Sequence, residues 1–201
     1  TFRVKDGKGC ITVVQASLGQ PPAVGVSVGL DTSIVLGDSI LLTAEVSNAF
    51  GMVEYEWRSY LLENFICADT PECSMIWAKP YQTNTYRVIV TDENGCQGEA
   101  RVKVEVNKPR GIYIPTGFSP NGDLNNDLLV VYGKSRQIRN VLDFRVYDRW
   151  GELVYQDKNF SVNDETRGWD GLFRDKECDP GVYVWYVEVE YEDGYIESMK
   201  G

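Results

Sequence analysis

Apolar and polar residues alternate in short runs along most of the chain, which is the period-two pattern of β-strands. The clearest runs lie at 39–46, 53–57, 85–90, 100–106, 144–147, 153–155 and 182–189. Gly, Asn and Asp turns separate the runs, and no helical period lies between them. The pattern therefore predicts an all-β fold made of two consecutive antiparallel β-sandwich domains.

Two proline-containing segments, 20–23 and 108–111, divide the chain as linkers would. A length of 201 residues suits two domains that each bury a core of their own. We therefore expect an Ig-like β-sandwich at 21–108 and a second, C-terminal β-domain at 109–201. In the second domain the run at 182–189 is apolar on both faces, which is typical of a central strand or of one docked on a neighbour.

The first residues repeat a pattern found later in the chain. Thr1–Val4 followed by Asp6–Cys10 resembles Thr85–Val88 followed by Asp92–Cys96, and both read as a strand, a Gly turn and a Cys before the next strand. We interpret residues 1–20 as the last hairpin of a preceding Ig-like repeat, so the chain is expected to be a piece of a longer tandem array. The Asn94–Gly95 pair is expected to supply the positive φ angles of a tight hairpin turn.

Three tryptophans can be interpreted in two ways each. Alternation points Trp57 at the core between the sheets, although an exposed Trp could also stack on a sugar. Trp169 precedes an Asp-Gly pair, and Trp150 precedes a Gly. We predict that each of these two rings packs beneath its turn, with a functional surface as the alternative.

Composition excludes several classes of function. The formal net charge is −10 and the basic residues are scattered, so a nucleic-acid interface is not expected. The chain contains no histidine, no G-x-S-x-G elbow and no phosphate-binding glycine loop, so we predict that it is not an enzyme and holds no catalytic residues. No apolar run approaches the roughly 20 residues that span a bilayer.

The chain has five cysteines, none with the C-x-x-C spacing of a zinc site. Cys67 and Cys73 are expected to form a disulfide that closes a short loop, which suits an oxidising compartment. A bridge from Cys96 to either of them is the alternative. An odd number leaves at least one thiol without a partner in this chain.

Four oxygen-bearing side chains alternate in one loop, Asn121, Asp123, Asn125 and Asp127. This spacing lets a loop wrap a hard cation, so these residues are a candidate calcium site, and calcium is the cofactor to consider. The alternative is a metal-free loop in which the same side chains close Asx-turns. The complete D-x-D-x-D-G pattern of an EF-hand is missing.

The loop also belongs to a recognisable signature. Residues 114–127 read Ile-Pro-Thr-Gly-Phe-Ser-Pro-Asn-Gly-Asp-Leu-Asn-Asn-Asp, which resembles the opening of the gliding-motility-associated C-terminal domain of Bacteroidetes. Residues 144–155 resemble that family's central hairpin, 168–171 its W-D-G turn, and 180–185 its P-x-G-V-Y strand. The one departure is that Pro180 directly precedes Gly181. Four motifs in the right order make the match specific.

The resemblance implies that residues 109–201 are a type B sorting signal of the type IX secretion system, recognised at the outer membrane. The implied partners are outer-membrane components of that system, a PorP-like barrel protein above all, and the neighbouring Ig-like repeats of the same chain. The protein is then secreted, displayed outside the outer membrane, and used in gliding or adhesion. The region at 21–108 looks like the Ig-like or PKD-like repeats that precede such domains, and it would serve as a spacer. The alternative is a carbohydrate-binding appendage and sorting signal of a secreted polysaccharide-degrading enzyme.

Overall fold

The structure is a computed structural model that describes residues 1–15, 19, 22–61 and 65–201. The described residues form strands and turns without a helix, so the all-β prediction is correct. Nothing in the described part of the chain is a helix long and apolar enough to cross a membrane. The linker expected at 20–23 falls partly on Gln20 and Pro21, which lie outside the described residues.

The N-terminal hairpin consists of β1 (Phe2–Lys5) and β2 (Ile11–Val14), which pair antiparallel. All residues of both strands are exposed, including Phe2, Val4 and Ile11. These apolar side chains have no core to enter in the described structure. A two-stranded ribbon of this kind is marginal by itself in water.

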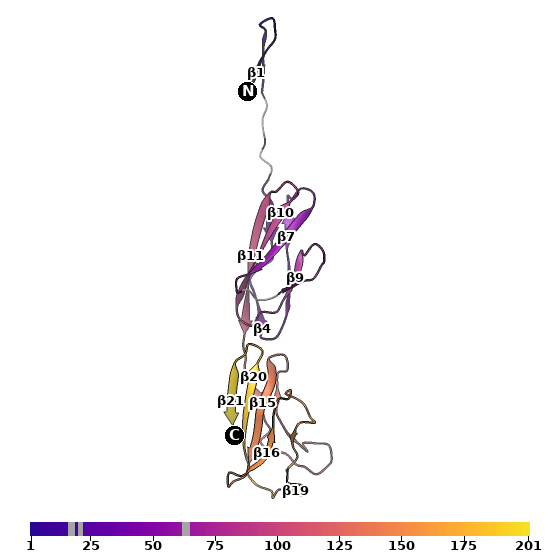
Figure 1. Ribbon diagram of the computed structural model, residues 1–201, viewed down its shortest axis with the longest axis vertical. Coiled ribbons are helices and arrows are strands. Elements are labelled where there is room, and N and C mark those ends of the chain that lie inside the picture. The colour runs from indigo at the N-terminus through magenta and orange to yellow at the C-terminus, as the bar shows by residue number, and fades with distance from the viewer. Residues whose placement is uncertain (16–18, 20–21, 62–64) are drawn as a thin grey trace.

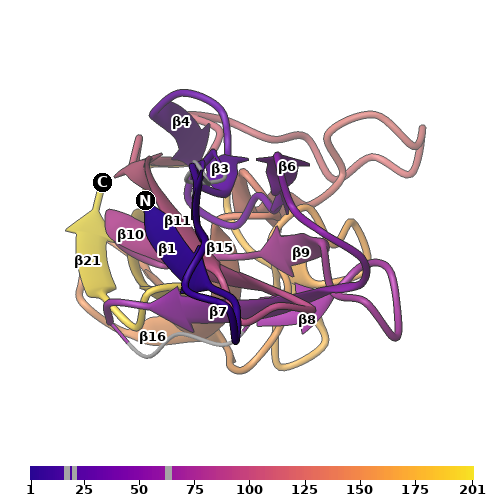
Figure 2. The ribbon, with the colours of Figure 1, turned by 90° about the horizontal axis from the view of Figure 1, so that it is seen from above.

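The middle of the chain forms an Ig-like sandwich (Figure 1). Its strands are β3 (Gly25–Ser27), β4 (Thr32–Val35), β5 (Ile40–Thr43), β6 (Glu45–Ser47), β7 (Val53–Ser59), β8 (Phe65–Cys67), β9 (Met75–Ala78), β10 (Asn84–Asp92) and β11 (Gln97–Asn107). One sheet has the order β4-β11-β10-β7, another β5-β9-β8, and β3 pairs with β6. Figure 2, a view along the long axis, shows β8 and β9 on the opposite side of the molecule from β10 and β11.

The core of this domain follows the alternation seen in the sequence. On β10 every second side chain is buried, with Tyr86, Val88 and Val90 fully so, and they pack with Trp57 of β7. The predicted run at 39–46 divides into β5 and β6 at Ala44, but its alternation is confirmed, because Leu42 and Ala44 are buried and the residues on either side of each are more exposed. Burial of such side chains stabilises a domain by roughly 25 cal/mol per Å² of apolar surface.

One pairing differs from the antiparallel prediction. β4 runs parallel to β11, with Thr32 opposite Val104 and Val35 opposite Asn107. Because parallel partners point the same way, the ends of both strands reach the same end of the sandwich. That end faces the C-terminal domain (Figure 1).

The C-terminal domain is built on one four-stranded sheet, ordered β16-β15-β20-β21. Its strands are β12 (Ile112–Tyr113), β13 (Leu129–Val130), β14 (Tyr132–Gly133), β15 (Ile138–Tyr147), β16 (Leu153–Asp157), β17 (Gly168–Trp169), β18 (Leu172–Phe173), β19 (Lys176–Glu177), β20 (Val184–Tyr191) and β21 (Ile196–Lys200). The short pairs β12-β14 and β13-β17 supply residues to the core beside this sheet. The strand expected at 182–189 is shifted to Val184–Tyr191, and it is central in the sheet, which is the first of the two alternatives for a run that is apolar on both faces.

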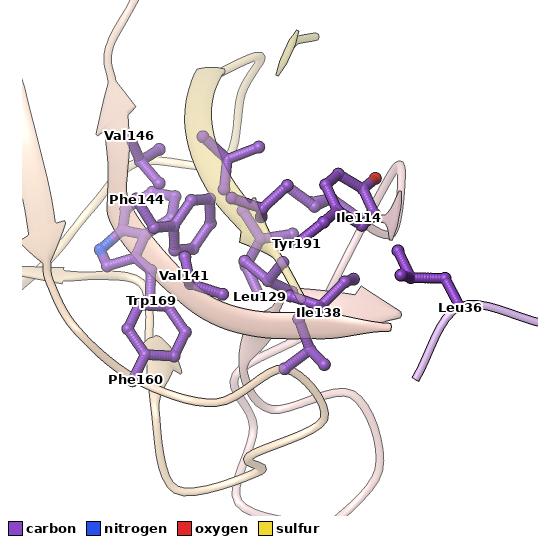
Figure 3. Packing of buried hydrophobic residues seen from close by; sticks show 14 of the residues in the cluster. Leu36, Ile114, Leu129, Ile138, Val141, Phe144, Val146, Phe160, Trp169 and Tyr191 are labelled. Atoms are coloured by element: carbon purple, nitrogen blue, oxygen red, sulfur yellow. The ribbon is translucent and has the colours of Figure 1, made fainter. Parts of the chain in front are cut away.

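The core of the C-terminal domain has aromatic rings at its centre. Phe144, Trp169 and Tyr191 are fully buried, and Figure 3 shows Trp169 beside Phe144 and Phe160. Tyr183 meets Trp169 edge to face with 4.7 Å between ring centroids. Such aromatic pairs add about 0.5–1.5 kcal/mol beyond the area they bury.

One hairpin turn recurs in all three parts of the chain, at Asp6–Cys10, Asp92–Cys96 and Asp148–Glu152. In each, Oδ1 of the first Asp accepts hydrogen bonds from the backbone N–H groups two and four positions later, over 2.8 to 3.0 Å. The Gly at the fourth position takes a φ of 81° to 89°. The sequence placed the turn at Asn94–Gly95 correctly, but only Gly95 has positive φ, and the Asp side chain closes the turn.

Candidate functional site

The loop proposed for calcium is held together by its own side chains. Oδ1 of Asp127 accepts hydrogen bonds from the N–H groups of Asn121 and Gly122, both at 2.8 Å, and Oδ2 accepts one from the N–H of Leu124 at 2.8 Å. The hydrogen bond from Gly122, with the other backbone donors, lowers the pKa of the Asp127 carboxyl. The Asp127 carboxylate thus holds the loop in its conformation.

The remaining candidates bond locally. Oδ1 of Asn121 accepts from the N–H of Asp123 at 3.0 Å, and Oδ1 of Asp123 accepts from the N–H of Asn125 at 2.8 Å. These are Asx-turns, the alternative that the sequence left open. Among the described residues no group of three or more Cys, Asp or Glu side chains is arranged to hold a metal. Calcium at this loop stays a prediction.

The loop at 67–73 is closed by a disulfide between Cys67 and Cys73, the pairing that the sequence favoured over one with Cys96. Their Cα atoms are 5.0 Å apart, within the usual range for a bridge. Nε1 of Trp57 donates to the carbonyl of Cys73 over 2.9 Å. The disulfide loop is therefore fastened to the core of the Ig-like domain, and Trp57 is a core residue, as predicted.

Trp169 also packs beneath its turn as predicted. Its side chain is 1% exposed, and Nε1 donates to the carbonyl of Leu172 at 3.0 Å. Asp170 accepts from the N–H of Leu172, which closes the turn over the ring. Gly171 has a φ of 80°, which Gly adopts without strain.

The prediction for Trp150 is wrong. Its side chain is 85% exposed, because it occupies the third position of the turn that Asp148 closes. That turn extends beyond the end of the sheet, so a side chain there has no core beneath it. An exposed Trp is unusual, since burying a large aromatic side chain is strongly favourable.

A groove of about 410 Å³ runs past Trp150. Its apolar walls include Phe173 at the end of β18 and Tyr183 and Val182 just before β20, and Val182 is 83% exposed. Its lining includes Val154 of β16 and both residues of β19, two strands that Figure 1 labels in the half of the C-terminal domain away from the Ig-like domain. We call this surface the tip groove.

Charged side chains of both signs border the tip groove. Arg174 stacks on the ring of Phe173, 4.5 Å from its centroid, and pairs with Glu152 at 3.5 Å. Arg149 lies 6.0 Å from the ring centroid of Trp150. An apolar centre with a charged rim is the usual anatomy of a protein-binding surface.

The tip groove also contains a free cysteine, Cys178. Burial raises the pKa of its thiol and outweighs the opposing hydrogen bond to Tyr183. The hydroxyl of Tyr183 donates to the carbonyl of Asp179 over 2.8 Å. A thiol with a raised pKa is protonated at neutral pH and is a poor nucleophile, so this arrangement suits binding better than covalent chemistry.

Sequence reasoning missed the tip groove because its lining comes from two separate stretches of the chain, 148–154 and 173–183. One local feature of the sequence could have identified the exposed tryptophan. In the Asp148–Glu152 turn, Trp150 lies between the Asp that closes the turn and the Gly, outside both strands. The equivalent positions of the other two turns are held by Lys8 and Asn94, both exposed. A Trp at a position that elsewhere holds polar residues indicates a surface role.

Comparison with known proteins identifies one family. Residues 112–201 match the family model CHU_C, the type IX secretion signal domain. No curated protein matches the chain.

Among solved structures, the fibronectin(III)-like modules of Clostridium thermocellum CbhA align over 88% of this chain and 92% of their own, with 14% identity and a TM-score of 0.33. The Bacteroides ovatus protein SGBP-B, solved in complex with a mixed-linkage heptasaccharide, aligns over 88% of this chain, with 10% identity and a TM-score of 0.34. This chain covers 46% of that protein.

Proposed function

Residues 112–201 belong to the type IX secretion signal domain family, and on this premise we propose that they form a type B sorting signal that holds the protein at the cell surface. The domain before it is a spacer, and the whole chain is the C-terminal region of an exported protein used in gliding or adhesion. The observation that carries the proposal is the family match to a β-domain with a buried aromatic core. A rigid β-domain presents loops at fixed positions, which suits it to recognition by a receptor.

The tip groove is the surface that we expect the secretion machinery to contact. Trp150 and Val182 both line this groove and both expose apolar surface there, at 85% and 83%. Trp is enriched among the residues that dominate binding energy at interfaces. The partner is an outer-membrane component, a PorP-like barrel protein, that offers an apolar pocket to Trp150.

Residues 1–20 fit the last hairpin of an upstream repeat. Their register matches that of β10 and β11 when 86 is added to each residue number: Phe2↔Val14 corresponds to Val88↔Ala100. The exposed Phe2 then takes the position of the fully buried Val88. This register supports the proposed division into 1–20, 21–108 and 109–201, with another repeat as the proposed neighbour of the Ig-like domain.

The carbohydrate-binding alternative has one observation in its favour. Trp77 of β9 is half exposed, on the outer side of the sheet β5-β9-β8. Its cross-strand neighbours are the exposed Leu41 and Ile66, both aliphatic. Stacking on a sugar favours a platform of several aromatic rings. A single Trp between two aliphatic side chains therefore supports the spacer role better than the sugar-binding role.

The test is export of residues 1–201 fused to a signal peptide and a reporter in a bacterium with a type IX secretion system. Deleting residues 112–201 is expected to leave the fusion inside the cell envelope. Trp150→Ala is expected to reduce surface display roughly tenfold or more without lowering the melting temperature, because it removes an exposed anchor. Trp77→Ala is the matched control, an exposed Trp in the other domain, and should be displayed normally.

Normal display of the deletion would refute the sorting role. Loss of surface display in Trp77→Ala, with normal display of Trp150→Ala, would show that the secretion machinery contacts the Ig-like domain instead of the tip groove. Binding of soluble glucans to the wild-type chain, lost in Trp77→Ala, would favour the alternative function.

A further inference from the structure

Leu36 of the Ig-like domain is buried in the core of the C-terminal domain. It follows β4 directly, is 1% exposed, and packs in the cluster that contains Ile114, Ile138 and Tyr191. Figure 3 shows its side chain pointing from a separate segment toward Ile138 and Ile114. The Ig-like core formed by the described residues does not include it. One domain therefore completes the hydrophobic core of the next.

The parallel pairing of β4 and β11 brings Leu36 to this position. Both strands end at the junction, and the N–H of Leu36 donates to the carbonyl of Asn107 over 2.8 Å. Val106, near the end of β11, joins the same C-terminal cluster, and Ile34 packs against both cores. The apolar contact is thus continuous across the boundary.

The backbones of the two domains touch beside Leu36. Gly37 has a φ of 90°, and a Cβ atom placed on it would lie 1.7 Å from the carbonyl oxygen of Arg136. Only glycine fits this contact, because any other side chain would overlap the backbone of the C-terminal domain. Asp38 and Arg136 form a surface ion pair at 3.4 Å next to it.

The linker is fixed on the other side of the junction. Lys108 and Arg110 pair with Asp193 in the turn between β20 and β21, at 2.9 and 2.7 Å. The guanidinium of Arg110 lies over the rings of Tyr191 and Tyr195, 4.6 and 4.0 Å from their centroids. The N–H of Gly111 donates to the hydroxyl of Tyr191 over 3.1 Å. A segment with these contacts is not a free tether.

From these contacts we propose that the sorting signal is a two-domain unit: the last Ig-like domain inserts Leu36 into the C-terminal core, and the two domains hold one fixed orientation. The preceding domain of the same chain therefore covers this surface of the C-terminal domain. It does so through the buried side chain of Leu36 and the backbone contact at Gly37. The functional reading rests on the proposed sorting role. The unit that must fold before recognition then extends upstream of residue 112.

The structural test is hydrogen exchange of the full chain, read separately for each domain. Leu36→Ala is expected to increase exchange in β15 and β20 and to lower the melting temperature of the C-terminal domain by roughly 10 °C, because a buried leucine is lost from its core. Leu30→Ala, at a side chain that is 90% exposed, is the matched control and should change neither domain. Faster exchange confined to the Ig-like domain in Leu36→Ala would overturn the proposal.

Gly37→Ala tests the fixed orientation. Its control is Gly29→Ala, since Gly29 has a similar φ of 81° but nothing within 4 Å of an added Cβ. Small-angle scattering is expected to give one rigid elongated shape for the wild type and for Gly29→Ala, and a broader range of shapes for Gly37→Ala. Identical curves for all three would contradict the rigid junction.

Export of the same variants separates this inference from the proposed function. Reduced display of Leu36→Ala and Gly37→Ala, with both controls normal, supports the two-domain signal. If deleting 112–201 blocks export while both junction variants exchange hydrogen and are displayed like the wild type, the two-domain inference fails and the sorting role stands. If the deletion is displayed normally while Leu36→Ala still increases exchange in β15 and β20, the sorting role fails and the shared core stands.

Discussion

Replacing Asp193 by Asn removes the charge that holds the linker against the C-terminal domain. The Asp193 side chain is 9% exposed and accepts hydrogen bonds from Lys108 at 2.9 Å and from Arg110 at 2.7 Å. Asparagine has nearly the same shape, so the change acts mainly on electrostatics. The two cations would then lie beside a neutral side chain.

The size of the effect follows from the pKa of Asp193. Burial disfavours its charged form, but the hydrogen bonds from Arg110 and Lys108 outweigh burial and lower the pKa from 3.8 to about 2. A decrease of this size corresponds to about 2 kcal/mol of folding stability at neutral pH. The melting temperature of Asp193→Asn should therefore lie roughly 5 to 10 °C below that of the wild type at pH 7.

The same pKa also determines the pH range over which Asp193 stabilises the protein. Because the folded-state pKa is depressed, the contribution of Asp193 is complete above the unfolded pKa, near 4, and is lost as pH falls toward 2. Thermal melting of the full chain between pH 7 and pH 2 should show the two proteins converge at the acid end. Glu54→Gln, at an exposed residue of β7, is the control for removing one negative charge. Parallel curves at every pH, or no difference at pH 7, would refute the role of Asp193.

Two further predictions concern the loops. Replacing Cys67 and Cys73 by Ser should lower the free energy of unfolding by about 2 kcal/mol, because the bridge closes a short loop. Denaturant unfolding without reductant measures this, with Cys96→Ser, at an exposed free thiol, as the control. Equal unfolding midpoints for the double variant and the control would show that the bridge adds no stability. If the 121–127 loop binds calcium, adding calcium should raise the melting temperature of the wild type, and Asp127→Asn should abolish that rise. A melting temperature that is the same in calcium and in excess chelator would favour a metal-free loop.

The sequence predicted best what depends on neighbours along one strand. Alternation identified Trp57 as a core residue, because the two faces of a strand are readable from successive positions. The tight turn before Cys96 was located for the same local reason. The partner of Cys67 was favoured correctly because a bridge across a short loop needs little long-range information.

What the sequence missed depends on contacts between distant segments. The parallel pairing of β4 with β11 joins residues about 70 positions apart along the chain, as Thr32 opposite Val104 illustrates, and no local pattern specifies it. Leu36 reads as an ordinary apolar residue before a Gly, and only the assembled junction gives it a core to enter. Trp150 was assigned to the interior because Trp169 and Trp150 both precede small turn residues, although only Trp169 lies over the sheet.

The parallel pairing of β4 and β11 also determines how the protein responds to tension. A pull along the chain enters the Ig-like domain at β3 and leaves it at the end of β11, and once it passes β3 it draws β4 and β11 in opposite directions along their shared length. All hydrogen bonds between them are then loaded together instead of one after another. The strand pair that brings Leu36 to the neighbouring domain therefore also gives the Ig-like domain a shear geometry that resists a pull between its two ends.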